Sequence, residues 1–217
     1  MITVYGEGRG FRVVWLLEEM GLPYRLRDVD LIAGLGNDPE FLAINPAGFI
    51  PALRISDETG DVTMVESVAI MEYLLARHGP SPLAPTPQDP AFPAWLQFLH
   101  LGEAGLAASI YFVSGARHIA PENERDNWSA GQALSVFTSR LMLVTQQLQT
   151  ADYMVGDRFT AADISVGYAL EMARRNAGIK FAAPEQAYLE RLRERPAYQR
   201  ALATCHATRD WWASQPD

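Results

Sequence analysis

Glu66 and Ser67 place a carboxylate and a hydroxyl side by side where a helix is predicted to begin. The unpaired N–H groups and the positive dipole end of a helix start attract a carboxylate ligand, and Ser67 adds a hydroxyl donor. Glu66 can receive an ammonium group. Such a pair suits the head group of an amino acid. The alternative is structural: Ser67 only caps the helix and Glu66 only favours its dipole.

A second motif, Asn-Pro-Ala-Gly-Phe-Ile-Pro-Ala-Leu, occupies residues 45–53 and forms a turn that enters a strand. Pro51 lies directly before that strand and is a candidate for a cis peptide bond, because only X-Pro bonds adopt cis at modest cost. A cis bond would turn the backbone N–H and C=O of Ile50 toward an extended peptide ligand. The alternative is an ordinary trans bond.

The loop after the first strand, residues 6–12, holds the candidate anion-stabilising groups. These are the cations of Arg9 and Arg12 and the backbone N–H groups around Gly10. Tyr5 is the nearest hydroxyl. The alternatives are that both arginines are solvated on the first helical turn and that Tyr5 lies in the core.

The segment Phe-Thr-Ala-Ala-Asp at residues 159–163 has a structural explanation. Thr160 and Asp163 are spaced as a capping box, and Phe159 and Ile164 are spaced as a hydrophobic staple. We expect this motif to start a helix and to take no part in chemistry.

The elements that position these residues change character along the chain. The first third alternates between predicted strands at 2–5, 24–31, 52–55 and 62–65 and predicted helices at 11–20, 39–43 and 66–77. A proline-rich stretch follows, and the periodic segments after it are helical: 94–115, 122–150, 161–177, 185–194 and 197–213. We therefore predict an α/β domain at 1–79, a linker at 80–92 and an all-α domain at 93–217.

Composition excludes several classes of function. The 217 residues include 26 acidic and 18 basic side chains, a net charge of −8, which disfavours binding to nucleic acid. The one cysteine, Cys205, cannot form an internal disulfide or a cysteine-rich metal site. We find no signal peptide and no apolar stretch that would suit a membrane span. These features predict a cytoplasmic protein without a metal.

Together the motifs resemble the glutathione transferase superfamily. The resemblance rests on N-P-x-G-x-[IV]-P-x-L at 45–53, E-S-x-A-I-x-x-Y-L at 66–74 and F-T-x-A-D at 159–163, and it spans nearly the whole chain. It implies a thioredoxin-like α/β domain with a mixed four-stranded sheet, followed by an all-α helical-bundle domain. It also implies glutathione as co-substrate and a homodimer.

The resemblance implies roles for individual residues. Ile50 would pair its backbone with the cysteinyl part of glutathione beside a cis Pro51, with Phe49 next to it. Glu66 and Ser67 would hold the γ-glutamyl end. The helix at 94–115 would line the pocket for the electrophile, with these side chains as candidates: Trp95, His100, Glu103 and Tyr111.

The loop at 6–12 departs from the family pattern. Many relatives carry Ser, Cys or Tyr there to favour the thiolate of glutathione, and here Gly10 occupies the expected position. Phe49 replaces a residue that is often polar. The candidates for thiolate stabilisation are therefore Tyr5, Arg9, Gly10 and Arg12. The main expectation is a detoxifying transferase that conjugates glutathione to a small hydrophobic electrophile or uses glutathione to reduce it. There are two alternatives. One is a non-catalytic binding or regulatory protein, and the other is a glutathione-dependent isomerase or disulfide reductase.

Overall fold

The computed structural model describes residues 1–29, 38–58, 60–125 and 127–214, which form two compact units. The first unit contains Met1–Ser81 together with Arg195–Trp211. The second contains Pro82–Glu194 and the residues from Trp212 onward. The boundary after Ser81 lies in the proline-rich stretch, whereas the return of the C-terminal segment to the first unit differs from the predicted division at 93–217.

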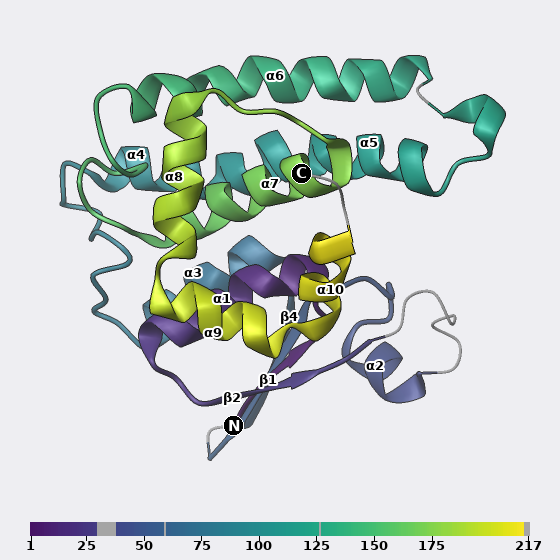
Figure 1. Cartoon of the computed structure of the whole chain (residues 1–217). Helices are drawn as coiled ribbons and strands as arrows, with labels where there is room; N and C mark the ends of the chain where they lie inside the picture. Colours follow the sequence, from purple (N-terminus) through teal and green to yellow (C-terminus); the bar gives the residue numbers. More distant parts are fainter. Residues whose placement is uncertain (30–37, 59, 126, 215–217) are drawn as a thin grey trace. The chain divides into compact units, whose positions relative to one another are not determined.

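The first unit is built on a four-stranded mixed sheet with the order β2-β1-β3-β4 (Figure 1). The strands are β1 Ile2–Tyr5, β2 Tyr24–Arg27, β3 Ala52–Asp57 and β4 Gly60–Val65. β1 is parallel to β2 and antiparallel to β3, and β3 is antiparallel to β4. The predicted mixed sheet is confirmed.

Helices α1 Phe11–Met20, α2 Pro39–Ile44 and α3 Ser67–Arg77 complete the N-terminal part of this unit. They lie within two residues of their predicted ranges. Gly21 ends α1 in the left-handed conformation, φ +65°, as expected for a glycine after a helix. The second strand is shorter than its predicted range of 24–31, because regular pairing stops at Arg27; positions 30 and 31 lie outside the described residues.

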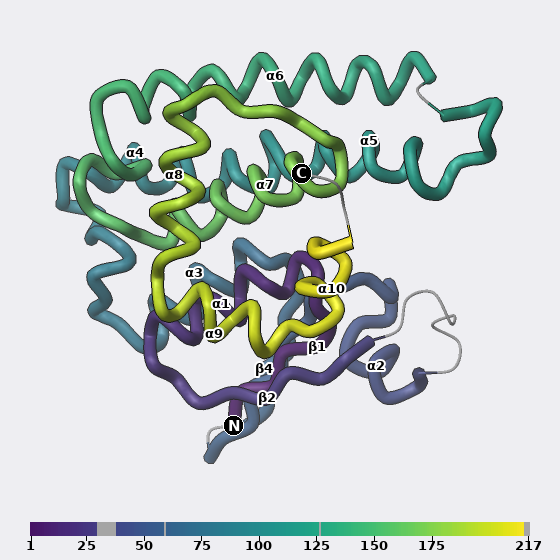
Figure 2. The backbone as a smooth tube through the Cα atoms, in the orientation of Figure 1, coloured from purple at the N-terminus to yellow at the C-terminus, as the bar shows by residue number. Residues whose placement is uncertain are grey.

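Helix α1 is buried over most of its surface. Its first seven residues, Phe11 to Leu17, have essentially no exposed area. The C-terminal helix α9 Pro196–Thr204 packs along α1 (Figure 2). The Tyr198 ring of α9 contacts the rings of Phe11 and Trp15 edge-on. The amphipathic pattern of α1 therefore reflects only one of the two surfaces that bury it.

The predicted last helix at 197–213 is in fact two helices, α9 and α10 His206–Ser214. The break falls at Cys205, whose backbone leaves the helical region at φ −85° and ψ 77°. The carboxylate of Glu7 accepts hydrogen bonds from the backbone N–H groups of Ala207 and Thr208, which satisfies the start of the new helix. A contact distant in sequence thus determines the break, and the local pattern does not reveal it.

The second unit consists of helices. A continuous helical run contains α4 Phe92–His100, a π-helix η3 Leu101–Ala107 and α5 Ala108–His118. It is followed by the short 3-10 helix η4 Glu122–Glu124 and by α6 Trp128–Leu148, α7 Ala161–Ala177 and α8 Ala183–Arg193. Figure 1 shows α6 running beside α5, and α7 packs against α4 and α5. The predicted helices are confirmed, with α6 starting later than expected because 3-10 and loop residues precede it.

The π-helix was not predicted, and its cause is a close contact with α7. A Cβ atom on Gly102 would lie 2.3 Å from the Oγ of Ser165. That hydroxyl donates to the carbonyl of Leu99 at 2.7 Å, so a side chain from another helix occupies an acceptor of the helical ladder. Glycine at position 102 permits this approach.

Helix Phe92–His118 is long and apolar enough to cross a membrane by length and composition, contrary to the expectation that no stretch qualifies. Half of its most apolar window of 18 residues is buried within the protein. The core helix of a water-soluble protein satisfies the same criterion, so this finding is weak evidence for a membrane span.

Candidate functional site

Strand register brings the sequence motifs to one end of the sheet. Tyr5, the last residue of β1, is paired with Ala52, the first residue of β3, and with Arg27 at the end of β2. Ala52 is also paired with Val65, the last residue of β4. The same edge of the sheet therefore carries the loop after β1, the turn before β3 and the start of α3.

Ile50 presents an unpaired backbone edge at this end of the sheet. The Ile50–Pro51 bond is cis, as the resemblance implied. Among the described residues neither the N–H nor the C=O of Ile50 has a hydrogen-bond partner. Asn45 fixes the turn by donating to the carbonyl of Phe49 at 2.6 Å, and the Phe49 side chain is 38% exposed. An extended peptide can pair with such an edge as a further strand does.

The loop glycines make room for the Ile50 side chain. Gly6 has φ +82°, and a Cβ atom there would lie 2.3 Å from Cγ2 of Ile50. A Cβ on Gly8 would lie 3.8 Å from Cδ1 of Ile50, and one on Gly10 would lie 3.4 Å from Cβ of Pro51. Close packing between the loop and the Ile50–Pro51 turn explains the Gly-x-Gly-x-Gly pattern.

Glu66 and Ser67 occupy an unusual backbone conformation at the start of α3. Glu66 is exposed and has φ +70° and ψ 108°, a region that non-glycine residues rarely adopt. Such strain is common where a fold presents groups to a ligand. Ser67 is 2% exposed, and its Oγ accepts a hydrogen bond from Nη1 of Arg12 at 3.2 Å.

Arg12 is placed beneath Ser67 and away from solvent. It has no exposed area, although a guanidinium is costly to bury, so it is not the solvated cation of the structural alternative. Its guanidinium donates to Ser67, and its role as a thiolate-stabilising cation stays a prediction. Its observed contact assigns it to positioning Ser67. Arg9, by contrast, lies half-buried in the short 3-10 helix η1 Gly8–Gly10.

Tyr5 is a core residue, in agreement with the structural alternative. It is 3% exposed, its ring lies 6.1 Å from that of Phe41, and the guanidinium of Arg27 stacks 5.5 Å from its ring centroid. Because it is buried in the core, Tyr5 is not a surface donor of the loop.

The backbone N–H groups of the loop are largely engaged. Gly6 donates to the carbonyl of Arg27 at 2.8 Å and Gly10 to that of Glu7 at 3.0 Å. Gly8 donates to Oγ1 of Thr208 on α10 at 3.2 Å. Glu7 and Thr208 were not among the predicted site residues, because nothing in the local sequence signals a contact across 200 positions.

Cys205 lies in the first unit, at the junction of α9 and α10, and it is fully buried. Burial raises the pKa of its thiol, and the negative charges of Glu7, Asp28 and Glu18 raise it further. The thiol is therefore protonated at neutral pH and is a poor nucleophile.

The four residues predicted to line an electrophile pocket have different surroundings in the second unit. Trp95 is 5% exposed, and its indole N–H donates to the carbonyl of Leu83 at 3.1 Å, which makes it a core residue. His100 is exposed at the end of α4, and Glu103 is half-buried in η3. Tyr111 on α5 is 54% exposed.

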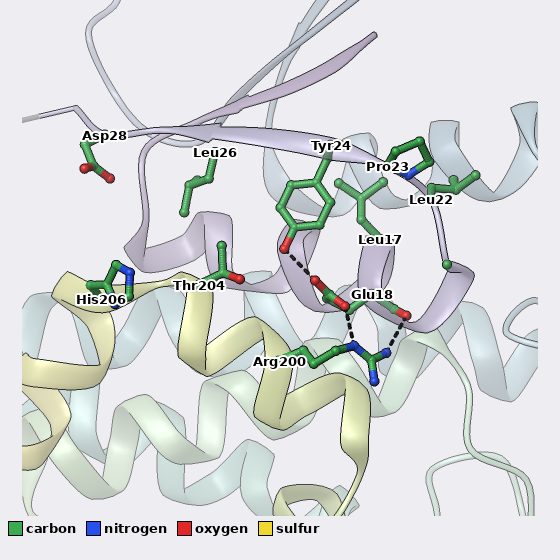
Figure 3. A pocket seen from close by; sticks show the side chains of 11 residues that line it. Leu17, Glu18, Leu22, Pro23, Tyr24, Leu26, Asp28, Arg200, Thr204 and His206 are labelled. Carbon is green, nitrogen blue, oxygen red and sulfur yellow. Dashed lines mark hydrogen bonds and ion pairs between the residues drawn. The ribbon is translucent and has the colours of Figure 1, made fainter.

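A cavity of about 770 Å³ lies elsewhere in the first unit, beside β2, α1 and α9 (Figure 3). In its wall Glu18 accepts from the hydroxyl of Tyr24 at 2.7 Å and from Nε of Arg200 at 2.6 Å. Burial and the neighbouring Glu18 raise the pKa of Tyr24. None of the predicted site residues lines this cavity, so we assign it no part in the candidate site.

The capping box at the start of α7 is confirmed as a structural motif. Asp163 has no exposed area, and its carboxylate accepts from the backbone N–H groups of Met154 and Thr160, each at 2.8 Å, and from the hydroxyl of Tyr188 at 3.0 Å. Burial outweighs these donors and raises the pKa of Asp163 to about 6. Across the described residues, no cluster of three or more His, Cys, Asp or Glu side chains could hold a metal ion.

Comparison with known proteins places this geometry in a family. The model of the glutathione S-transferase N-terminal domain matches residues 10–77. Glutathione S-transferase GstB of Escherichia coli is 28% identical over 210 residues, covering 93% of this chain and 98% of the relative. The disulfide-bond oxidoreductase YfcG of the same organism is 30% identical over 198 residues, covering 89% of each chain.

A solved structure shares the fold. A glutathione transferase from Burkholderia graminis, crystallised with two glutathione molecules per subunit, matches with a TM-score of 0.82 and 24% identity, covering 94% of this chain and 88% of the other. The thioredoxin-like and helical architecture is thus confirmed. Glutathione S-transferase 3 of Zea mays is 30% identical over 205 residues, covering 88% of this chain and 87% of the relative. The chain belongs to the glutathione S-transferase family.

Proposed function

We propose that the protein binds glutathione at the end of the sheet formed by β1, β3 and β4 and uses its thiolate on a small hydrophobic electrophile, by conjugation or reduction. The unpaired backbone edge of Ile50 beside cis Pro51 carries this proposal. Glutathione is a short extended peptide, and its cysteinyl N–H and C=O can form an antiparallel pair with Ile50. Phe49, which precedes Ile50, would cover the peptide with an apolar side chain.

The γ-glutamyl end of glutathione fits the start of α3. Its carboxylate would accept from the hydroxyl of Ser67 and from the helix N-terminus, and its ammonium group would pair with Glu66. Because Arg12 donates to Ser67 Oγ, the serine proton remains directed toward a ligand. The pairing of Ala52 with Val65 supports a head-group site next to Ile50, as a bound tripeptide requires.

The electrophile would bind near the helical unit. We retain His100, Glu103 and Tyr111 as proposed lining residues, since each has exposed or partly exposed area, and we expect Trp95 to support them from the core. We also propose a cytoplasmic homodimer, with neither nucleic acid nor membrane as partner.

The enzymatic proposal is tested by binding and activity together. Purified protein should bind immobilised glutathione, elute with free ligand, and conjugate glutathione to a chloronitroaromatic compound. Sedimentation should give about 48 kDa, twice the chain mass of 24.1 kDa. Failure to bind glutathione at millimolar concentration in calorimetry would refute the proposed site.

A second candidate is a glutathione-dependent disulfide reductase. It is favoured by the similarity to YfcG, whose name describes a disulfide-bond oxidoreductase. Glutathione-dependent reduction of a small model disulfide, faster than conjugation of the chloronitroaromatic compound, would select this function. Glutathione binding with neither activity would select the non-catalytic alternative.

A further inference from the structure

A hydroxyl from the C-terminal helix reaches the loop that lacks one of its own. Residues 6–12 contain no Ser, Thr, Cys or Tyr. Thr208, in the first turn of α10, places its Oγ1 3.2 Å from the backbone N of Gly8. Both residues belong to the first unit.

The position of Thr208 is fixed by Glu7. The two carboxylate oxygens of Glu7 accept from the N–H of Ala207 at 3.2 Å and from the N–H of Thr208 at 2.7 Å. Glu7 is 9% exposed and Thr208 is 7% exposed, so water competes little for these bonds. Carboxylate and hydroxyl together fasten the start of α10 to the loop.

The hydroxyl of Thr208 can donate a hydrogen bond of its own. Its oxygen accepts from Gly8, and among the residues that the structure describes its own proton has no acceptor. A hydroxyl that accepts an N–H bond becomes a stronger donor, because the two bonds polarise each other. Gly8 also adjoins Ile50, the residue proposed to pair with the cysteinyl part of glutathione.

We infer that Thr208 donates its hydroxyl proton to the glutathione sulfur and that Glu7 positions it for this task. The inference rests on the proposed function. A free thiol has a pKa of about 8.5, and a hydrogen-bond donor aimed at the sulfur favours the thiolate. The sulfur would lose its proton to solvent and attack the electrophile carbon. A C–S bond then forms as chloride leaves a chloronitroaromatic compound with the bonding electron pair, while Thr208 keeps its proton.

Other candidates are less suited to this role. Tyr5 is buried against Phe41, Arg12 is engaged with Ser67, and the Cys205 thiol is buried with a raised pKa. Thr208 combines proximity to the loop, a fixed backbone and an available proton. The break between α9 and α10 is what brings Thr208 to the loop at residues 6–12.

The test compares Thr208→Val, which removes the hydroxyl at nearly constant shape, with Thr208→Ser, which retains it. Thr204→Val is the matched control, because Thr204 lies one turn earlier, in the cavity wall of Figure 3, and bonds Tyr24. For each full-length variant, calorimetry gives the affinity for glutathione, and ultraviolet absorbance of the thiolate gives the pKa of the bound thiol.

Thr208→Val should raise the pKa of bound glutathione by about one unit and lower kcat/KM near neutral pH about tenfold, with less than a threefold change in affinity for the protonated thiol. Thr208→Ser and Thr204→Val should stay within about twofold of the wild type. Glu7→Gln should raise the thiol pKa as well, and it tests the inference independently if Thr208→Val folds poorly.

An unchanged thiol pKa in folded Thr208→Val, or an equal loss in Thr208→Ser, would overturn this inference while leaving the proposed function intact. A wild-type protein that binds no glutathione would overturn both. A wild type that binds glutathione with the thiol pKa of free glutathione would overturn the role of Thr208 alone.

Discussion

Arg12 and Ser67 illustrate what residue types do and do not reveal. The spacing of Glu66 and Ser67 before a helix predicts an amino-acid head-group site, and strand register places that pair beside Ile50. Arg12 was predicted as a cation near the sulfur, but its side chain points into the core and reaches Ser67. Periodicity in the first turn of α1 does not distinguish these roles, because the partner of Arg12 is Ser67, 55 positions away at the start of α3.

Ser67→Ala should weaken glutathione binding about tenfold or more, since a hydrogen bond to a charged group contributes about 1.5–3 kcal/mol. Calorimetry measures the affinity. The free energy of unfolding should fall by about 1.5–3 kcal/mol as well, because the buried guanidinium of Arg12 loses its hydrogen bond to Ser67. Ser135→Ala on the exposed face of α6 is the control and should alter neither quantity. Unchanged affinity in Ser67→Ala would exclude Ser67 as a ligand-binding residue.

Gly6→Ala separates close packing from backbone strain when it is compared with Gly21→Ala. Both glycines have positive φ, +82° and +65°, so both variants incur a backbone cost of about 1–2 kcal/mol. Only Gly6 would bring a Cβ to 2.3 Å from Ile50, whereas Gly21 has open space. We expect Gly6→Ala to lose glutathione affinity as well as stability and Gly21→Ala to lose stability alone, measured by calorimetry and urea unfolding. Equal affinities would show that the Ile50 contact does not shape the site.

At the scale of elements, hydrophobic periodicity and capping signals predicted most helices and strands. Helix α7 occupies its predicted range, and Thr160 and Asp163 form the predicted capping box at its start. The π-helix η3 and the break at Cys205 were not predicted. Both depend on contacts distant in sequence, Ser165 with Leu99 and Glu7 with Thr208.

Gly102→Ala should destabilise the second unit by about 2–4 kcal/mol, because its Cβ would overlap the Ser165 side chain and backbone. Gly115→Ala is the matched control in α5 of the same helical run. It meets nothing within 4 Å and should stabilise the protein by about 0.5–1 kcal/mol. Thermal and urea unfolding give both values, and similar effects from the two changes would contradict the close approach of η3 to α7.

Asp163 should make stability depend on pH. Its folded pKa of about 6 lies above the ordinary value of 3.8, so between these values the folded protein holds a proton that the unfolded chain has released. Raising the pH therefore favours unfolding, and the contribution present below about pH 3.8 is lost as pH rises through about 6. The loss is about 3 kcal/mol at most.

Asp163→Asn removes this titration. Relative to the variant, the free energy of unfolding of the wild type should fall between pH 4 and pH 7 in urea unfolding experiments. A difference between wild type and variant that stays constant with pH, or that grows as pH rises, would show that the folded pKa is not raised.

At the scale of the whole molecule, the chain builds its first unit from two distant segments. Arg195 forms two hydrogen bonds to Glu19 at 2.6 and 2.8 Å, and Arg200 bonds Glu18, so the C-terminal segment is fastened to α1 by charge as well as by Tyr198. The first boundary between the units, after Ser81, lies in the proline-rich stretch. The local sequence does not signal that the C-terminal segment joins the first unit. Thr208 lies in that segment and was therefore not predicted as a site residue.

A crystal structure of the protein with glutathione tests most directly whether the peptide binds along Ile50 with its head group at α3. We predict hydrogen bonds between the cysteinyl backbone and the N–H and C=O of Ile50, the γ-glutamyl group at Glu66 and Ser67, and the sulfur within hydrogen-bond distance of Thr208. Glutathione bound elsewhere, with Ile50 and Ser67 free of ligand, would contradict it.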